Sequence, residues 1–322
     1  LDLDFLLLPG DLTQHGEREN HRWLRDRLAT LPFPTYVVPG NHDVTRPEGD
    51  DERIGLPEFP HCYPKQGYQG QAQLYYCCQP LPGINLIGLN SNWFDAQGKQ
   101  QGVVDTEQLE WFAQTLATLK PGFTIVMIHH NLIEHLPNQS QHPLSRRYML
   151  SNAPDLLDIL QRSPVQESTL IVTGHLHVQD IAHQGSIWEI TTGSLVSYPH
   201  PYRLCQLKQA ENGQYSLAVE SPRIHAVPDW PDLQTQSRDW MGQHSERFML
   251  KLLTAPPFNC SEQTAEPFLP HLRYFWAKIA DGDPYFEFPQ FPEPMQRYFE
   301  RFNAADVNGG LQTSDNDTTL IW

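Results

Sequence analysis

The sequence predicts an α/β fold, because short apolar runs alternate with segments of helical periodicity in the first part of the chain. Residues 5–8 form a continuous apolar run, which is typical of a strand buried on both faces. Residues 17–31 carry leucines at i, i+4 and i+7, so they predict an amphipathic helix. A second strand is predicted over residues 35–38. These three elements make a β-α-β unit.

The same alternation is repeated further along the chain. Residues 84–89 and 123–128 are predicted strands, and Asp105 is a suitable N-cap for a helix between them that runs to residue 119. A short helix is predicted over residues 152–160, and a further strand over residues 170–172. A sheet with parallel neighbours is therefore expected.

The pattern changes twice after this. Short runs separated by glycines indicate antiparallel strands over residues 181–219. Helices are predicted over residues 238–253 and 272–279, the second from apolar side chains at i, i+3, i+4 and i+7. We therefore expect a main domain over residues 1–227 and a C-terminal helical extension, rich in aromatic residues and proline, over residues 228–322.

Charge and cysteine content limit the classes of partner and compartment. The formal net charge is −16, which argues against nucleic acid and anionic membranes as partners. A run of about 18 apolar residues, as a membrane span needs, is absent from the sequence. The chain has five cysteines, an odd number without a C-x-x-C pattern, so we expect buried thiols, a reducing compartment and a cytoplasmic location.

Four segments with metal-ligating side chains each follow a predicted strand. They are Gly10-Asp11, Gly40-Asn41-His42-Asp43, His129-His130-Asn131 and Gly174-His175-Leu176-His177. The carboxyl ends of strands are where α/β sheets place their sites, so these side chains are expected to meet at one edge. Taken singly, each segment is more typical of a turn, a cap or a surface feature. Their order and spacing favour a common site.

In that order, the segments resemble the motifs GD, GNHD, H and GHLH of the calcineurin-like metallophosphoesterases. The segments around residues 9–13 and 37–43 are most similar to the branch that includes bacterial cyclic-nucleotide phosphodiesterases, and the resemblance covers residues 4–205. It implies a four-layer α-β-β-α sandwich of two mixed sheets with metals at one edge. It also implies metal-dependent hydrolysis of a small phosphate ester, most of all a phosphodiester, by a hydroxide that two metals activate.

The resemblance also implies a ligand set for two divalent ions. Asp11 would bridge both metals, His177 would bind the first, and the second would be held by Asn41, His129 and His175. Oxygen and imidazole donors without thiolate suit manganese, iron or zinc.

Two further residues of these segments are expected to take part in catalysis. His42 would stabilise the transition state or protonate the departing alkoxide. Asp43 would orient His42, or would be a carboxylate that only supports the turn. His130 either reaches the substrate or faces solvent, and Asn152 and Tyr198 are candidates for the rim.

One family motif is missing, namely a D-x-H segment upstream of Gly10 that supplies two ligands to the first metal. Either the chain is truncated or one metal site is incomplete, and we favour truncation because the other motif residues are all present. An incomplete site would favour a different class of function, a non-catalytic binding or scaffold module on the same fold. A nuclease is a third hypothesis, but it would need a basic groove.

The extension after residue 228 has no recognisable catalytic motif. Its aromatic residues predict buried contact area, either in a helical cap on the same chain or in a lid or an arm that forms a homodimer. Residues 308–319 are polar enough to fray. Substrate specificity is expected to reside in the loops 45–80 and 131–150.

Overall fold

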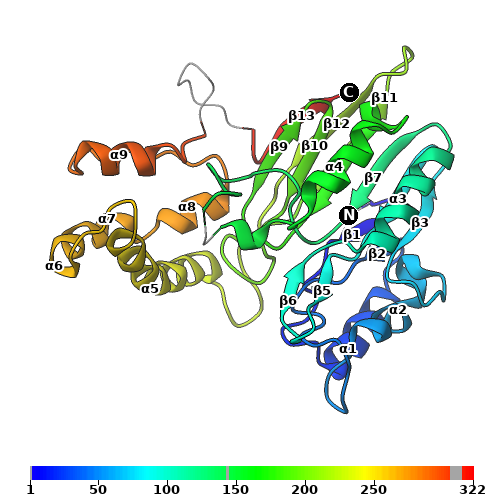
Figure 1. Ribbon diagram of the computed structural model, residues 1–322, viewed down its shortest axis with the longest axis horizontal. Helices are drawn as coiled ribbons and strands as arrows, with labels where there is room; N and C mark the ends of the chain where they lie inside the picture. Colours follow the sequence, from blue (N-terminus) through cyan, green and yellow to red (C-terminus); the bar gives the residue numbers. More distant parts are fainter. Residues whose placement is uncertain (1, 143–144, 305–313) are drawn as a thin grey trace. The chain divides into compact units, whose positions relative to one another are not determined.

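The computed structural model describes residues 2–142, 145–304 and 314–322 (Figure 1). The chain divides into two compact units. The first comprises Leu1–Leu176, Ala182–Thr191 and Trp322, and the second comprises His177–Ile181 and Thr192–Ile321. The predicted domain boundary near residue 227 lies inside the second unit, and it stays a prediction.

A mixed six-stranded sheet forms the centre of the first unit. Its order is β3 (Tyr76–Leu81), β4 (Ile84–Gly88), β7 (Phe123–Met127), β8 (Thr169–Thr173), β10 (Ile187–Thr191) and β9 (Asp180–Gln184). Strands β4, β7, β8 and β10 are parallel, whereas β3 is antiparallel to β4. The predicted α/β class with a mixed sheet is confirmed. The loop that begins near residue 45 ends in β3.

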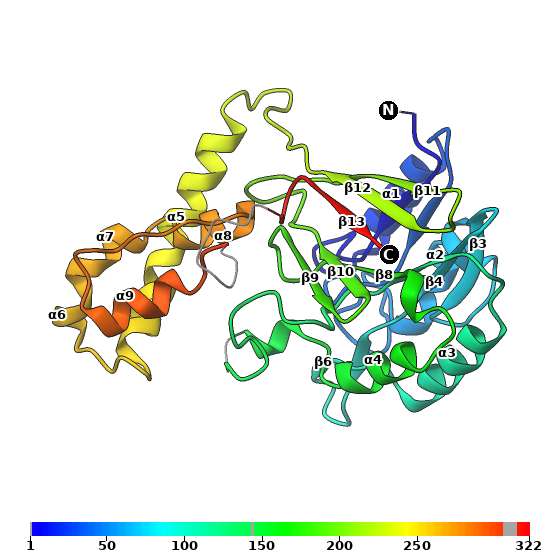
Figure 2. The same ribbon diagram turned by 90° about the horizontal axis from the view of Figure 1, so that it is seen from above.

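Helices α3 (Thr106–Thr118) and α4 (Ala153–Gln161) cover one face of this sheet (Figure 2). The predicted N-cap is confirmed, because the Asp105 carboxylate accepts a hydrogen bond from the backbone N–H of Gln108 at 2.8 Å. Apolar side chains from both helices and from the strands form the core beneath, including Phe112, Leu116, Leu156, Leu160, Ile87, Val126 and Ile171. This packing fixes the ends of β7 and β8, from which two of the predicted ligands extend.

The predicted first β-α-β unit is confirmed. It consists of β1 (Leu6–Leu8), α1 (Arg18–Leu28) and β2 (Thr35–Val37), and the two strands are parallel. The long excursion that follows contains a short helix, α2 (Phe59–Cys62), with a helical turn on each side at Leu56–Glu58 and Pro64–Tyr68. Aromatic packing holds it against α1, since the rings of His21 and Phe59 lie 5.9 Å apart. A hairpin of β5 (Asn92–Phe94) and β6 (Gln100–Gly102) completes the strands of this unit.

The second unit contains a three-stranded antiparallel sheet with β12 (Tyr215–Glu220) between β11 (Leu204–Gln209) and β13 (Thr318–Ile321). The hairpin of β11 and β12 was predicted. The fraying predicted over residues 308–319 is wrong at its end, because β13 begins at Thr318 and pairs with β12. Residues 308–313 of that prediction lie outside the described residues.

The C-terminal extension is mainly helical, as predicted. Its helices are α5 (Leu233–Thr254), α6 (Glu262–Ala265), α7 (Leu269–Leu272), α8 (Phe275–Asp281) and α9 (Glu293–Glu300). The helix predicted over residues 272–279 is divided between α7 and α8 by a turn at Arg273 and Tyr274. Phe275 and Phe299 pack edge to face at 5.1 Å, so the predicted aromatic contact area is found within this unit.

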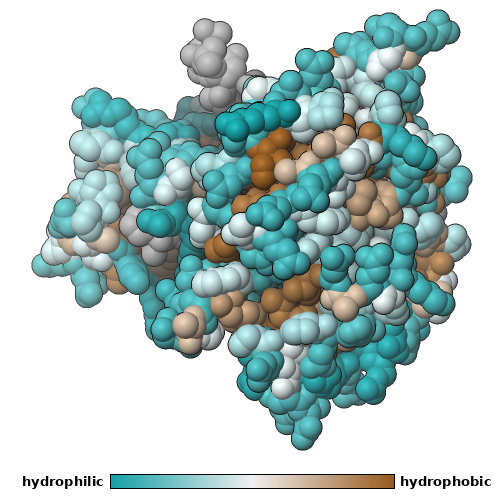
Figure 3. Space-filling model, turned by 45° about the vertical axis from the view of Figure 1, so that its right-hand side comes forward, coloured by the Kyte–Doolittle hydropathy of each residue, from teal (hydrophilic) through white to brown (hydrophobic). Residues whose placement is uncertain are grey.

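The described part of the chain contains no helix that is both long enough and apolar enough to cross a membrane. The face in Figure 3 is mostly hydrophilic, with small separate hydrophobic areas, as the excess of acidic residues leads one to expect.

Candidate metal centre

The motif segments of the first unit follow β1, β2, β7 and β8, whose ends bring four predicted ligands together around His129. Its Nε2 atom lies 3.0 Å from Oδ1 of Asn41 and 3.1 Å from Nδ1 of His175. The same atom lies 3.4 Å from Oδ2 of Asp11. Four side chains that are far apart in the sequence therefore point at one small volume.

These four atoms fit a cation. The other ring nitrogen of His129, Nδ1, lies 2.7 Å from the backbone carbonyl of Pro9, which can only accept a hydrogen bond. Nδ1 therefore carries a proton, and in the neutral ring Nε2 presents a lone pair to the cluster. The ligand atoms of Asp11, His129 and His175 all lie within 4.8 Å of one another. This set of imidazole and oxygen donors is one that manganese, iron and zinc accept.

The charges of Asp11 and His129 reinforce each other. Burial raises the pKa of Asp11, but the neighbouring His129 and the backbone N–H of His42 together lower it well below its usual range. Burial lowers the pKa of His129, but the Asp11 carboxylate, the Pro9 carbonyl and the charge of Asp43 together raise it by more, so the net shift is upward. Asp11 is thus ionised at neutral pH and available as a ligand.

The backbone around the cluster has little room for larger side chains. Asp11 and His175 have positive φ values of 57° and 61°, which non-glycine residues adopt mainly where the surrounding structure demands it. A Cβ on Gly40 would lie 2.1 Å from the backbone nitrogen of Asp11, and one on Gly10 would lie 2.6 Å from Nδ1 of His129. The glycines in the motifs are therefore needed for this close approach.

His42 lies beside the cluster, and its backbone N–H donates to Oδ1 of Asp11 at 2.9 Å. Its side chain is half-buried, and Nδ1 lies 2.8 Å from the carbonyl of Gln14. That carbonyl fixes Nδ1 as the protonated nitrogen of the neutral ring and leaves Nε2 for exchange of a proton.

Asp43 is fully buried and supports the backbone of the motif loops. Its carboxylate accepts hydrogen bonds from the backbone N–H groups of Thr13 and Gly40, both at 2.8 Å. Burial and the charge of Asp11 raise the pKa of Asp43 to about 7. Within the described ranges, its side chain makes no hydrogen bond with the imidazole of His42. Its part in orienting His42 stays a prediction.

His130 is buried, so the alternative in which it faces solvent is wrong. Its Nδ1 lies 2.7 Å from the hydroxyl of Ser91, and its ring centroid lies 4.3 Å from that of His175. Gly102 allows this position, because a Cβ there would lie 2.6 Å from the ring. Burial and the charge of His129 lower the pKa of His130 well below its usual value, so the ring is neutral.

A buried carboxylate that the sequence analysis missed, Glu189 of β10, holds the loop after His129. It accepts hydrogen bonds from the backbone N–H groups of Leu132 and Ile133 at 3.0 and 2.7 Å. The side chains of Asn131 and Thr173 also donate to it, and Nε2 of His135 lies 3.1 Å away. The signal in the sequence was a single acidic residue inside the strand segment IWEIT.

The loop between β7 and α4 adds two side chains near the cluster. The ring of Tyr148 lies 5.2 Å from that of His175, and the guanidinium of Arg147 lies over the Tyr148 ring at 4.9 Å. Arg147 is exposed and therefore able to meet a phosphate group. Asn152 instead bonds the backbone of Val104 through both ends of its amide.

Two predicted site residues, His177 and Tyr198, belong to the second unit. His177 has an exposed side chain and a positive φ of 58°. The cluster described above is built entirely from the first unit, and the assignment of His177 as a ligand stays a prediction.

Comparisons with known proteins agree with this chemistry. A family model described as calcineurin-like phosphoesterase matches residues 1–179. A probable cyclic nucleotide phosphodiesterase of Moraxella catarrhalis is 28% identical over 187 residues, which are 57% of this chain and 61% of that protein. A probable glycerophosphodiester phosphodiesterase of Arcobacter nitrofigilis is 25% identical over 238 residues, which are 73% of this chain and 77% of that protein. A 3′,5′-cyclic-nucleotide phosphodiesterase of a Nostoc species is 26% identical over 176 residues, which are 55% of this chain and 56% of that protein. The chain spans less than two thirds of the length of the Moraxella and Nostoc proteins.

Proposed function

We propose that this chain, which belongs to the calcineurin-like phosphoesterase family, hydrolyses a phosphodiester bond in a small soluble substrate with the help of divalent metal ions. The observation that carries the proposal is the convergence of Asn41, Asp11 and His175 on Nε2 of His129. The printed functions of the relatives, hydrolysis of cyclic nucleotides and of glycerophosphodiesters, support the choice of a phosphodiester.

Asp11, Asn41, His129 and His175 would hold the metal. Divalent ions at such a site polarise the phosphoryl oxygens and make water more acidic, which supplies a nucleophile at neutral pH. The chain's own contribution is to fix the donor atoms before substrate arrives, through Pro9, Gly10 and Gly40. A low pKa of Asp11 keeps its carboxylate ionised for this task.

The leaving alkoxide needs a proton, and His42 is the residue that we assign to this role. Its Nδ1–H is held by the carbonyl of Gln14, so Nε2 is the nitrogen that would take up a proton, to form the imidazolium, and then deliver it to the alkoxide. The exposed guanidinium of Arg147 would neutralise charge on a non-bridging phosphoryl oxygen. His130 is neutral and buried, so we assign it to shaping the site and not to proton transfer.

The finer parts of the proposal concern the number of metals, the compartment and the assembly. A second metal ion would take Asp11 as a shared ligand and His177 as a ligand of its own, and manganese, iron or zinc suit both sites. The five free cysteines are consistent with a reducing compartment, which supports the cytoplasm. A homodimer would use the aromatic surface of the C-terminal extension.

The test is hydrolysis of bis(p-nitrophenyl) phosphate with added Mn²⁺. We compare the chain with its His42→Ala variant and with a matched control, His183→Ala, because His183 is exposed and its ring lies 4.7 Å from that of Trp188. His42→Ala is expected to lower the rate about 100-fold or more, as for loss of a general acid, whereas His183→Ala leaves it unchanged. Metal binding without hydrolysis, in this chain and in one extended upstream, would instead favour the non-catalytic binding module.

A further inference from the structure

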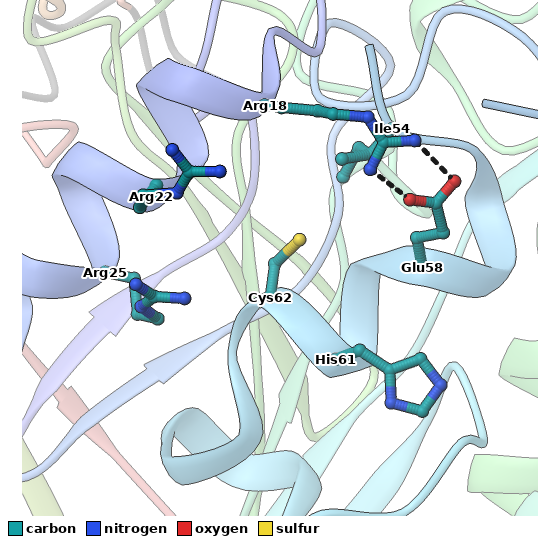
Figure 4. Close-up of a pocket in the computed structure, with 7 residues that line it drawn as sticks. All are labelled: Arg18, Arg22, Arg25, Ile54, Glu58, His61 and Cys62. Carbon is teal, nitrogen blue, oxygen red and sulfur yellow. Dashed lines mark hydrogen bonds and ion pairs between the residues drawn. The ribbon is translucent and has the colours of Figure 1, made fainter. Parts of the chain in front are cut away.

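Helices α1 and α2 of the first unit border a pocket of about 320 Å³ that carries three arginines (Figure 4). Arg18, Arg22 and Arg25 project from α1, and the opposite wall includes His61 and Cys62 of α2. Its volume is at the small end of the range for ligand sites. We call it the arginine pocket.

The spacing of the arginines places them on one face of α1. Steps of four and three residues bring side chains to the same side of a helix, where like charges repel and destabilise it. The chain as a whole has 22 basic and 38 acidic residues. A cluster of positive charge in so acidic a protein favours an anion as its partner.

The arginines are not equally balanced by carboxylates. Both terminal nitrogens of Arg18 contact Glu58, which also lines the pocket. Arg25 donates to Asp26, an exposed neighbour that does not line the pocket, and such surface pairs are weak. Arg22 forms no hydrogen bond or ion pair with any residue that the structure describes. The guanidinium groups of Arg22 and Arg25 are therefore available to a ligand.

The two helices are locked together, so the pocket is formed before any ligand binds. The buried His21 of α1 lies 2.8 Å, through Nδ1, from the hydroxyl of Tyr63, directly after α2. Its ring also packs edge to face against Phe59 and Tyr63 at 5.9 and 5.6 Å. A preformed site loses less conformational entropy on binding.

We propose that the arginine pocket binds a phosphate dianion through Arg22 and Arg25, with Arg18 adding charge from the next turn. Guanidinium groups match the oxygen geometry of phosphate in paired hydrogen bonds, which favours phosphate over a simple halide. The double charge of the dianion favours it over a carboxylate, since two arginines face it. The site is distinct from the metal cluster, since none of its lining residues belongs to the motif segments.

The phosphate dianion has two sources, free inorganic phosphate and a small phosphomonoester. The pocket has space beyond a phosphate ion, and Ile54 supplies an apolar wall for an organic group. Inorganic phosphate and phenylphosphonate, which has a phosphorus–carbon bond that resists hydrolysis, distinguish these sources. Tighter binding of phenylphosphonate would identify a phosphomonoester as the ligand, and equal binding would identify the phosphoryl group alone.

Cys62 provides a readout that belongs to this pocket and does not depend on catalysis. Its thiol points into the space beside Arg18 and Arg22 (Figure 4). Burial and the charge of Glu58 raise the pKa of Cys62, although the nearby arginines lower it, so alkylation by iodoacetamide is measured at about pH 8 or above. Peptide mass spectrometry of the intact, metal-loaded protein gives the alkylation rates of Cys62 and of the exposed Cys77 separately.

At a phosphate concentration ten times its Kd, alkylation of Cys62 is expected to slow about tenfold, while that of Cys77 is unchanged. The double variant Arg22→Gln/Arg25→Gln is expected to lose this protection. The matched control is Arg27→Gln, because Arg27 is on the same helix but lies over the ring of Trp23, outside the pocket.

The ratio of rates with and without phosphate is compared within each variant, so a change in the reactivity of the thiol itself does not affect the result. Protection that survives in the double variant, protection lost equally in Arg27→Gln, or no protection at any phosphate concentration would each overturn the proposal.

Discussion

Each unit contains a cluster of partly buried polar groups. The two clusters differ in whether their own side chains satisfy one another. In the first unit, Nε2 of His129 faces Asn41, Asp11 and His175, all through atoms that can accept a proton or bind a metal. One proton cannot satisfy all of these contacts. The donor atoms of this cluster therefore suit a cation.

The cluster of the second unit pairs opposite charges. Arg223 donates to the Asp281 carboxylate at 2.8 Å and to Oδ1 of Asn316 at 2.9 Å. Asp283 and Asp315 accept hydrogen bonds from each other's backbone N–H groups at 2.7 and 3.0 Å. These contacts join the end of α8 to the segment before β13. They stabilise the fold without any ligand, which is the behaviour of a structural cluster.

Replacing His129 tests the first half of this comparison and has the largest expected effect. His129→Ala removes the atom on which the other ligands converge, so the rate of metal-dependent hydrolysis is expected to fall more than about 100-fold. Stability should fall by only about 1–3 kcal/mol, because the Pro9 carbonyl loses its partner.

Thermal unfolding with and without Mn²⁺ checks whether the activity is lost through the metal. Mn²⁺ at 100 times its Kd should stabilise the wild-type chain by about 2.7 kcal/mol. The same addition should leave the His129→Ala variant unchanged. An equal increase in Tm for both proteins would show that the metal binds elsewhere.

Replacing Glu189 sharpens the comparison, because this residue supports the first cluster without belonging to it. In Glu189→Gln one carboxylate oxygen becomes an NH₂ group that faces the backbone N–H groups of the loop after His129. Loss of a supporting residue of this kind typically costs about 10- to 100-fold in metal affinity or activity. We expect a loss in that range.

Mn²⁺ titration and hydrolysis rates measure this effect, and Glu167→Gln is the control because Glu167 is exposed. Unchanged metal affinity in Glu189→Gln would mean that the loop keeps its position without the carboxylate.

The sequence was sufficient where local pattern decides structure. The apolar runs gave β1, β2, β7 and β8, and the motif residues that follow them do meet at His129. The approach of the Pro9 carbonyl to His129 and the role of Glu189 depend on contacts between segments far apart in the chain. No local pattern encodes such contacts.

Two errors in the C-terminal extension have the same origin. Leu272, Phe275 and Ile279 have helical spacing, but a turn at Arg273 and Tyr274 divides the segment between α7 and α8. Thr318 lies in a polar segment, yet β13 forms because β12 offers it a partner strand. Tertiary context overrides propensity in both cases.

The smallest expected effect concerns the pH dependence of the second cluster. Asp315 is 8% exposed, and burial, together with the charges of Asp180 and Asp283, raises its pKa to about 7 although Arg203 lowers it. The unfolded carboxyl ionises near pH 4, whereas the native one keeps its proton until about pH 7. Native Asp315 thus binds a proton that the unfolded chain has lost, so stability falls as the pH rises from about 4 to 7 and is level above that.

Asp315→Asn removes this dependence. A shift of this size corresponds to at most about 4 kcal/mol, and we expect about 1–3 kcal/mol because the native chain can relax around the ionised carboxyl; the acceptor that the amide loses shifts the stability equally at every pH and cancels. Denaturant titrations near pH 4 and pH 8 give the free energy of unfolding of each protein. Relative to the wild type, the variant should be more stable at pH 8 than at pH 4 by that amount. Asp317→Asn is the control, since Asp317 is exposed and, among the residues that the structure describes, accepts only from the backbone N–H of Ser221. A difference that is the same at both pH values would mean that Asp315 is ionised in the native state, with Arg203 compensating its charge.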